Sequence, residues 1–357
     1  MSMSAVEWKK LGDVCEILDS QRKPISKSKR VFGSYPYYGA NGIQDYVDGY
    51  IFDGTYLLVG EDGSVINKDN SPVLHWVSGQ FWVNNHAHIL SDIKDAAILK
   101  YLYYVLHTID VSDIVRGVPP KLNQENLKNI VIPIPSLAKQ QEIVSHLDTF
   151  TTLISNLENE LDMRRKQYEH YRNQLLDFDG VEGVEWKTLG DVAINRDRMR
   201  KPITASKRVA GIYPYYGASG IVDYVEGYIF DGNYLLISED GANLIARSTP
   251  IAFPISGKTW VNNHAHVLEF NNLITQRLIE IYLNSIDLTK YISGGAQPKL
   301  NQENLNSILI PIPSLATQQE IVSKLDAFEN LIQSLEQEIK LRKQQYEYYR
   351  EKLLTFE

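Results

Sequence analysis

The sequence contains two copies of one long unit, and this duplication limits the possible folds more than any other feature. The phrase YPYYGANGIQDYVDGYIFDG at residues 35–54 returns as YPYYGASGIVDYVEGYIFDG at residues 213–232. The phrases WVNNHAH, PKLNQENL, IPIPSLA and QQEIVS also return, each 178 residues after its first occurrence. Two copies at so long a period indicate tandem duplication of a whole unit rather than a solenoid or propeller. Each copy is long enough to have its own core.

The first part of each copy has the pattern of a mixed α/β domain. Short runs rich in Tyr, Val and Ile alternate with turn residues, which is typical of strands. We interpret YIFDGTYLLVG as two short strands that turn at Asp53-Gly54, and QFWVNNHAHIL as one strand with a polar kink. Apolar residues recur every three or four positions over residues 96–109, which predicts a helix. Asn123 is a candidate N-cap for a further helix. We expect the YPYYG tyrosines to pack in the sheet, with stacking on bases as the alternative.

The second part of each copy predicts one long helix, roughly 55 Å in length. Its apolar residues follow alternating steps of three and four, a heptad seam that favours pairing of the two helices. If the helices pair antiparallel, one domain lies at each end and an approximate two-fold axis relates them. The expected pairing residues are Leu147, Phe150, Ile154, Leu157, Leu161, Leu325, Phe328, Ile332, Leu335 and Ile339.

The predicted fold class is therefore α+β, with two similar mixed α/β domains joined by two long helices in an antiparallel coiled coil. We expect the first domain over residues 1–135 and its helix over residues 136–180. The second domain and helix then occupy residues 181–313 and 314–357.

Composition excludes several classes of protein. The chain has 44 acidic and 36 basic residues, a net charge of −8, which argues weakly against a free-standing nucleic-acid binder. Its single cysteine, Cys15, cannot form a disulfide within the chain and fits a reducing compartment. We find neither the apolar core of a signal peptide nor a run of 18 apolar residues. We therefore expect a cytoplasmic protein that makes no membrane contact.

Two kinds of segment are candidates for binding DNA. A basic run near the start of each copy, at residues 22–30 and 196–208, suits phosphate contacts on a loop, although a solvated surface loop is the alternative. The repeated NNHAH has side chains of the kind that read base edges. For NNHAH we favour a framework role over direct base reading, and the lack of a nearby Cys or acid cluster disfavours a metal site.

The two copies diverge where segment 64–76 corresponds to 242–254, where 15–21 corresponds to 193–199, and over residues 91–115. If each domain reads a sequence, these segments should carry the discrimination between half-sites. Unselected drift is the alternative. The full set of candidate DNA-binding residues is Arg22, Lys23, Lys27, Lys29, Arg30, Lys68, Asn84, Asn85, His86, His88, Lys121, Arg196, Arg198, Arg200, Lys201, Lys207, Arg208, Arg247, Asn262, Asn263, His264, His266 and Lys299.

No motif for catalysis is found. The sequence has no phosphate-binding loop, no zinc-type CxxC and no G-x-S-x-G elbow. GVPPK at Gly117 lacks the leading amide or acid and the aromatic residue of an amino-methyltransferase motif. The acidic pairs at Glu61 and Glu239 are followed by glycine, and a turn explains them more simply than a metal site. We expect no catalytic residue, metal or cofactor in this chain.

The repeated LGDV and YPYYGA phrases, with IPIPSLA-x-QQEIV leading into a long helix twice, resemble the DNA-specificity subunit of type I restriction–modification systems over essentially the whole chain. The resemblance implies a non-catalytic subunit that acts in phage defence. Each domain would read one half of a bipartite double-stranded DNA target, and the paired helices would set the gap. Two methyltransferase subunits that use S-adenosylmethionine to methylate adenine would dock on it. Restriction subunits that use ATP and Mg²⁺ can join them.

The two copies are more alike than the recognition domains of this family often are. Either the half-sites are similar, or a shared scaffold reads different sequences through its divergent segments. Two other functions stay open at this point. One is an enzyme that has lost its catalytic part, and the other is a two-headed scaffold for protein partners without a DNA role.

Overall fold

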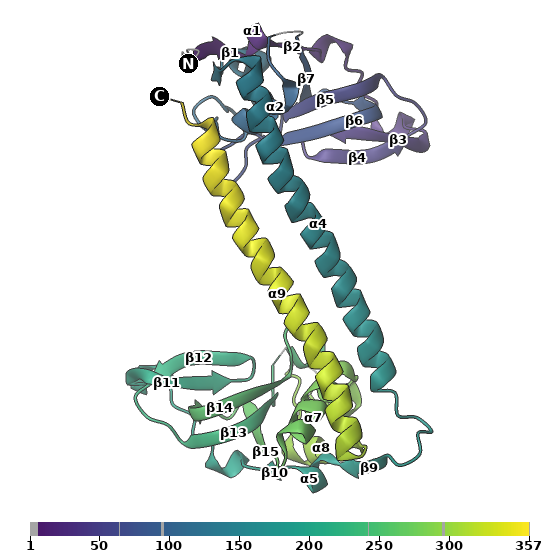
Figure 1. Ribbon diagram of the computed structural model, residues 1–357, viewed down its shortest axis with the longest axis vertical. Coiled ribbons are helices and arrows are strands. Elements are labelled where there is room, and N and C mark those ends of the chain that lie inside the picture. Colours follow the sequence, from purple (N-terminus) through teal and green to yellow (C-terminus); the bar gives the residue numbers. More distant parts are fainter. Residues whose placement is uncertain (1–5, 64, 94–95, 242, 295–296, 357) are drawn as a thin grey trace. The chain divides into compact units, whose positions relative to one another are not determined.

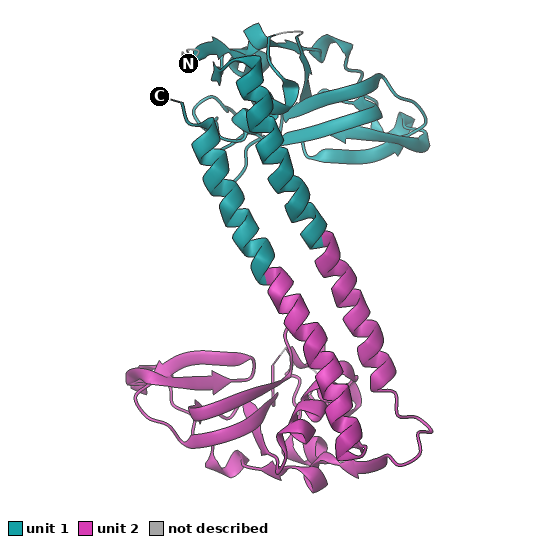
Figure 2. Cartoon of the chain, in the orientation of Figure 1, with its two compact units in different colours: residues 1–158, 337–357 teal, residues 159–336 magenta. Residues whose placement is uncertain are grey.

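The computed structural model describes residues 6–63, 65–93, 96–241, 243–294 and 297–356 (Figure 1). The chain forms two compact units, coloured separately in Figure 2. Unit 1 comprises residues 1–158 and 337–357, and unit 2 comprises residues 159–336. Unit 2 is thus continuous in sequence, whereas unit 1 is assembled from two separate segments.

A six-stranded mixed sheet forms the centre of unit 1, in the order β2-β7-β5-β6-β3-β4. Strands β3 and β6 are parallel, and the other pairs are antiparallel. A separate two-stranded sheet pairs β1 with β8. The strands are β1 Glu7–Lys10, β2 Cys15–Ile17, β3 Phe32–Gly39, β4 Gly42–Val47, β5 Phe52–Gly60, β6 Leu74–Val83, β7 Ala87–Asp92 and β8 Val131–Ile134. The helices are α1 Leu11–Val14, α2 Leu99–Leu106 and α3 Gln124–Lys128, with 3₁₀ turns η1 Asp19–Gln21 and η2 Lys27–Lys29.

Unit 2 repeats this topology, with the sheet order β10-β15-β13-β14-β11-β12 and the pair β9–β16. Its strands are β9 Glu185–Thr188, β10 Ile194–Asn195, β11 Ala210–Gly217, β12 Gly220–Val225, β13 Phe230–Ser238, β14 Ala252–Val261, β15 Ala265–Glu269 and β16 Leu309–Ile312. Its helices are α5 Leu189–Val192, α6 Asn243–Ala246, α7 Leu273–Ser285 and α8 Gln302–Asn306, with 3₁₀ turns η3 Asp197–Met199, η4 Ala205–Lys207 and η5 Thr289–Tyr291. The mixed α/β domain predicted for each copy is confirmed.

Two local predictions were wrong. Asp53-Gly54 does not turn the chain, because Gly54 lies inside the continuous strand β5 and pairs with Gly79 of β6. QFWVNNHAHIL is not one kinked strand but the end of β6 and the start of β7, which pair with opposite edges of β5. In both cases long-range pairing with β5 decides the structure, and a local turn signal cannot report that pairing.

Other local predictions are confirmed. Helix α2 lies within residues 96–109, and the Asn123 side chain caps α3 by accepting a hydrogen bond from the backbone N–H of Asn126 at 2.8 Å. The tyrosine at the third position of YPYYG is in the core: Tyr37 and its counterpart Tyr215 are almost completely buried. Packing in the sheet therefore explains these two side chains.

The long helices are α4 Leu137–Leu175 and α9 Leu315–Leu354, and each passes from one unit into the other. In unit 1, Phe150 stacks on Tyr349 with the ring centroids 5.4 Å apart. In unit 2, Tyr171 stacks on Phe328 with the centroids 5.3 Å apart. Together with the ion pairs described next, these stacks show that within each unit the partner numbers on α9 fall as those on α4 rise, so the pairing is antiparallel in each.

Ion pairs follow the same direction in each unit. Glu158 bonds Lys343 at 2.7 Å in unit 1, and Arg165 bonds Glu336 at 2.6 Å in unit 2. Along the predicted seam, Leu147, Leu325 and Ile339 are buried, and the remaining pairing residues are partly buried. The compact units divide each long helix near its middle, and the domain limits at 135, 180 and 313 stay a prediction. Within the described residues, no helix is long and apolar enough to cross a membrane.

Candidate nucleic-acid interface

A buried ion network ties together the loops at one end of each sheet. In unit 1 the guanidinium of Arg22 bonds the carboxylate of Glu61, where β5 ends, and that of Asp19 in η1, the latter at 3.3 Å. It also donates a hydrogen bond to the carbonyl of Ala87 at 2.9 Å. Three chain segments that are distant in sequence are thereby fixed to one side chain.

His88 completes the network from β7. Its Nδ1 lies 2.6 Å from Asp19 Oδ2 and its Nε2 lies 2.8 Å from the carbonyl oxygen of Leu122. An imidazole that carries a proton on both nitrogens can donate to both oxygens. Burial alone would raise the pKa of Asp19, but the hydrogen bond and charge of His88, with the charge of Arg22, hold that pKa below its ordinary value.

Unit 2 has the same network. Arg200 bonds Glu239 at 2.5 Å and Asp197 at 3.3 Å, and His266 Nδ1 lies 2.5 Å from Asp197. Burial would raise the pKa of Asp197 as well, but the hydrogen bond and charge of His266 outweigh it and lower that pKa. The two copies therefore preserve a geometry as well as a sequence.

The acidic and imidazole groups lie close enough together to be considered as metal ligands. One ligand atom from each of Asp19, Glu61 and His88 lies within 4.8 Å of the others. The Arg22 guanidinium, however, already bonds both carboxylates. The arginine thus supplies the positive charge that a cation would otherwise supply.

Exposed polar groups surround the network. Lys121 reaches Glu61 at 3.2 Å while half of its side chain stays exposed. Asn85 is exposed at the turn between β6 and β7, and His86 beside it lies 3.5 Å from Asp62. Asn84 is buried and holds this turn, because its side-chain oxygen accepts a hydrogen bond from the His86 backbone at 2.8 Å. This group of loops, residues 19–30, 61–63, 84–88 and 116–124, is called the loop cluster of unit 1 below.

The structure divides the predicted DNA-binding residues into two sets. The first set is buried or partly buried and bonded to other parts of the chain, so its side chains are not free at the surface: Arg22, Arg30, Asn84, His88, Arg200, Arg208, Asn262 and His266. Arg196 bonds Glu269 at 2.6 Å but keeps 39% of its side chain exposed, so its DNA contact stays a prediction. The second set has exposed side chains, and its DNA contacts stay a prediction: Lys23, Lys27, Lys29, Lys68, Asn85, His86, Lys121, Arg198, Lys201, Lys207, Asn263, His264 and Lys299.

Arg30 shows why a charge run in sequence is a poor guide to exposure. Its guanidinium bonds Asp45 at 3.2 Å and lies 4.2 Å from the centre of the Tyr37 ring. Arg208 makes the corresponding contacts with Asp223 and Tyr215 in unit 2. These arginines fasten the basic run to the sheet, and the lysines between them remain exposed.

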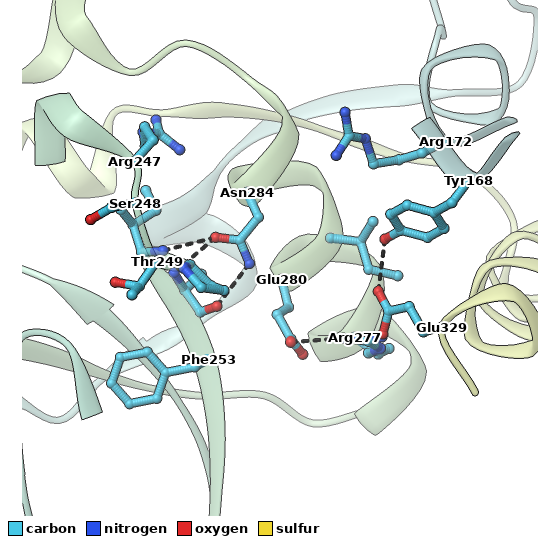
Figure 3. Close-up of a pocket in the computed structure, with 14 residues that line it drawn as sticks. Tyr168, Arg172, Arg247, Ser248, Thr249, Phe253, Arg277, Glu280, Asn284 and Glu329 are labelled. Carbon is cyan, nitrogen blue, oxygen red and sulfur yellow. Dashed lines mark hydrogen bonds and ion pairs between the residues drawn. The ribbon is translucent and has the colours of Figure 1, made fainter. Parts of the chain in front are cut away.

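Arg247 is the remaining member of the predicted set. It lines a cavity of about 480 Å³ in unit 2, between the β13–β14 connection, α7 and the unit 2 parts of the long helices (Figure 3). Its guanidinium donates hydrogen bonds to the carbonyls of Leu283 and Ile286 at the end of α7. These bonds direct the Arg247 side chain toward the end of α7, and its base-reading role stays a prediction. Ser64 and Ala242, at the starts of the divergent segments 64–76 and 242–254, lie outside the described residues.

Sequence reasoning missed the carboxylates that hold the network. Asp19 and Asp197 occupy equivalent positions in segments that otherwise differ, and that agreement was the available signal. Glu61 and Glu239 were interpreted as turn residues, whereas they are the buried partners of Arg22 and Arg200.

Comparison with known proteins gives consistent results. The sequence matches the family described as "Type I restriction modification DNA specificity domain" twice, over residues 3–163 and 181–341. It is 36% identical over 385 residues to a Haemophilus influenzae protein named as a putative type I restriction enzyme specificity subunit, with 99% of this chain and 96% of the relative covered. It is 30% identical over 384 residues to the EcoR124I/EcoR124II specificity subunit of Escherichia coli, with 98% and 94% covered.

Solved structures share the fold at low sequence identity. An S subunit of a type I restriction–modification system from M. genitalium superposes with a TM-score of 0.72 at 16% identity, covering 100% of this chain and 98% of that one. A chain from a study of complex assembly and conformational transition in a type I system gives a TM-score of 0.56 at 12% identity, covering 99% of each chain.

Proposed function

This chain belongs to the type I restriction–modification DNA specificity family, and we propose that it selects a bipartite DNA sequence for a methylating and restricting complex. Each unit reads one half-site. The observation that carries this proposal is the repeated loop cluster, in which exposed Lys, Asn and His side chains surround an identical buried network in both units.

The loop cluster suits DNA because its exposed groups divide naturally between two tasks. Lys23, Lys27 and Lys29 are exposed and form no ion pair with any residue that the structure describes, unlike Arg22 and Arg30, so they can contact phosphate oxygens. Asn85 and His86 carry hydrogen-bonding groups for base edges. The buried network fixes these loops before DNA arrives, which lowers the entropy cost of binding.

The long helices give the proposal its bipartite form. Helix α4 begins in unit 1 and ends in unit 2, and α9 runs in the opposite order along the chain. We propose that this antiparallel pair sets the number of unspecified base pairs between the half-sites. Two methyltransferase subunits that use S-adenosylmethionine dock on the chain, and restriction subunits supply ATP- and Mg²⁺-dependent chemistry. The chain itself contributes recognition and no reaction step.

Sequencing that detects adenine methylation tests the proposal directly. Cells that express this chain with its methyltransferase subunit are compared with cells that express the methyltransferase subunit alone. A split methylated motif that requires this chain supports the proposal. If no methylated motif depends on this chain, although both proteins are folded and bound to each other, the proposed function is overturned and the two-headed protein scaffold is favoured.

A charge-reversal variant tests the phosphate contacts separately. Lys27→Glu with Lys29→Glu should weaken binding of the assembled complex to all DNA sequences alike. It should also make the slope of log K against log salt concentration shallower by about 0.9 for each phosphate that is no longer neutralised. Lys166→Glu, which changes an exposed lysine of α4, is the matched control. Equal effects of the two changes would exclude the 27–29 turn as a phosphate-binding surface.

A further inference from the structure

The loop at residues 116–121 of unit 1 exposes an apolar side chain, and backbone hydrogen bonds hold both of its ends in place. Residues Arg116 and Lys121 close the loop by exchanging backbone hydrogen bonds at 3.0 and 2.8 Å. The backbone N–H of Gly63 donates a hydrogen bond to the carbonyl of Pro120 at 3.0 Å, which attaches the loop to the Glu61-Asp62-Gly63 segment. The loop is therefore part of the loop cluster and not a free surface turn.

Val118 lies at the tip of this loop with its side chain fully exposed, at 102% of the reference area. Pro119 and Pro120 follow it, and their rings restrict the backbone and remove two N–H donors. The tip is thus stiff and presents methyl groups rather than hydrogen-bonding groups. An isolated exposed valine is common, but this one stands on a loop that the fold holds in place at both ends and at Pro120.

The surroundings of Val118 favour DNA over an apolar protein surface. Arg116 is exposed, and its guanidinium donates only to the carbonyls of Ser112 and Val115 in the described part of the chain. Lys121, at the other end of the loop, bonds Glu61 at 3.2 Å and keeps half of its side chain exposed. A single apolar side chain between two cations is smaller than a protein docking patch, and it matches a groove whose walls are phosphates.

The corresponding loop of unit 2 has the same base and a different tip. Ser293 and Lys299 exchange backbone hydrogen bonds at 2.8 and 2.7 Å, and Gly241 donates to the carbonyl of Pro298 at 3.3 Å. Between the closing residues the sequence is GGAQP in place of GVPP, so the loop is one residue longer. Gln297 corresponds to Pro119, and residues 295 and 296, which correspond to the tip of the unit 1 loop in sequence, lie outside the described residues.

We propose that the tip of this loop determines sequence specificity, and that Val118 contacts the 5-methyl group of a thymine in the half-site read by unit 1. Apolar contact with the thymine methyl distinguishes a T·A pair in the major groove. Valine is too short to stack on a base or to separate a base step, so the base edge is the contact within its reach. The unit 2 loop has no valine between its closing residues and is one residue longer, so exchanging the two loops tests the role of this tip.

This inference rests on the proposed function, and a loop exchange separates the two. The exchange replaces residues 117–119 by residues 294–297 in the complete complex, and methylation sequencing then identifies both half-sites. A changed unit 1 half-site with an unchanged unit 2 half-site is the expected result. A wild-type motif that the exchange leaves unaltered overturns this inference alone. Absence of any motif with the wild type overturns the proposed function and the inference together.

DNA that contains uracil tests the methyl contact itself. Each thymine of the unit 1 half-site is replaced in turn by uracil, which lacks the 5-methyl group, and binding of the assembled complex is measured. One replacement should weaken wild-type binding about fourfold, the effect of removing one buried methyl group. Val118→Ser should bind thymine and uracil DNA equally.

Val131→Ser is the matched control, because Val131 is a half-exposed valine in β8 of the same unit. It should retain the wild-type preference for thymine. A Val118→Ser variant that still prefers thymine by the wild-type factor overturns the assignment of Val118 to the methyl contact.

Discussion

Units 1 and 2 keep the same buried network and attach differently to the long helices. In unit 1, Asp148 of α4 accepts a hydrogen bond from Tyr104 and lies 3.7 Å from Lys100. In unit 2, Arg277 of α7 contacts Asp326 and Glu329 of α9 together. The copies thus preserve the loop scaffold and vary the attachment of each domain to its helices.

The same contrast appears at the cavity of unit 2 and its counterpart in unit 1. Arg247 occupies the position that Asp69 occupies in unit 1, where Asp69, His107 and Arg350 line a cavity of about 480 Å³. The divergent segments therefore face helices at this point. The divergence here changes how each domain contacts its long helices, and the predicted role of these segments in base discrimination stays a prediction.

The largest effect is expected from breaking the network in one unit only. Arg22→Ala removes the guanidinium that the buried carboxylates of Asp19 and Glu61 share. His88 and Lys121 replace it only in part, so unit 1 should be destabilised by about 3 kcal/mol. Hydrogen exchange resolved by residue should show faster exchange in unit 1, and Arg200→Ala should show it in unit 2.

Lys23→Ala is the control, because it removes an exposed charge next to Arg22 and should change stability by less than about 0.5 kcal/mol. Equal exchange rates in the Arg22 and Lys23 variants would refute the structural role of the network.

A comparable effect is expected at the helix seam. Leu147→Ala and Leu325→Ala each remove a fully buried side chain, from α4 in unit 1 and from α9 in unit 2. Each should lower the free energy of unfolding by about 3 kcal/mol. Denaturant unfolding measures the decrease, and Leu153→Ala, at an exposed position of α4, should leave stability nearly unchanged.

Acid should weaken both units through the same carboxylates. The pKa values of Asp19 and Asp197 are lower in the folded chain than the ordinary value of 3.8. Their stabilising contribution is therefore present above the unfolded pKa, and it is lost as pH falls through that value toward the folded one. Asp19→Asn should flatten the pH dependence of unit 1 below about pH 4 and leave that of unit 2 intact. Equal acid sensitivity of both units in this variant would contradict the assignment.

The smallest effect is expected from reversing the charge of Asp69, whose counterpart in unit 2 is Arg247. Asp69→Arg gives unit 1 the residue type of unit 2 at an exposed position. Asp69 accepts hydrogen bonds from the Ser71 backbone and hydroxyl, and their loss should lower the stability of unit 1 by about 1 kcal/mol. Thermal unfolding measures this change, and Lys68→Ala serves as the control. A decrease above about 2 kcal/mol, well beyond the usual range for a surface substitution, would show that the cavity is a principal attachment rather than an adjustable one.

The sequence predicted the duplication, the long helices and their pairing because these follow from periodicity. It did not predict that Arg22 is internal, because its partner Glu61 is 39 residues away in sequence and meets it only in the folded sheet. For the same reason Gly54 was interpreted as a turn, although its pairing with Gly79 keeps it in a strand. Local sequence patterns cannot predict contacts that form only when the sheet assembles. The lysines of the basic run are exposed, as expected from the sequence.

The discontinuity of unit 1 has a consequence for synthesis of the chain. Leu354 of α9 packs in the same cluster as Leu147 of α4, so the core of unit 1 is complete only after residue 354 has left the ribosome. Everything that unit 2 requires lies between residues 159 and 336. Unit 2 can therefore finish folding before unit 1, although most of unit 1 is translated first. Until α9 is complete, the part of the unit 1 core that Leu354 covers stays exposed.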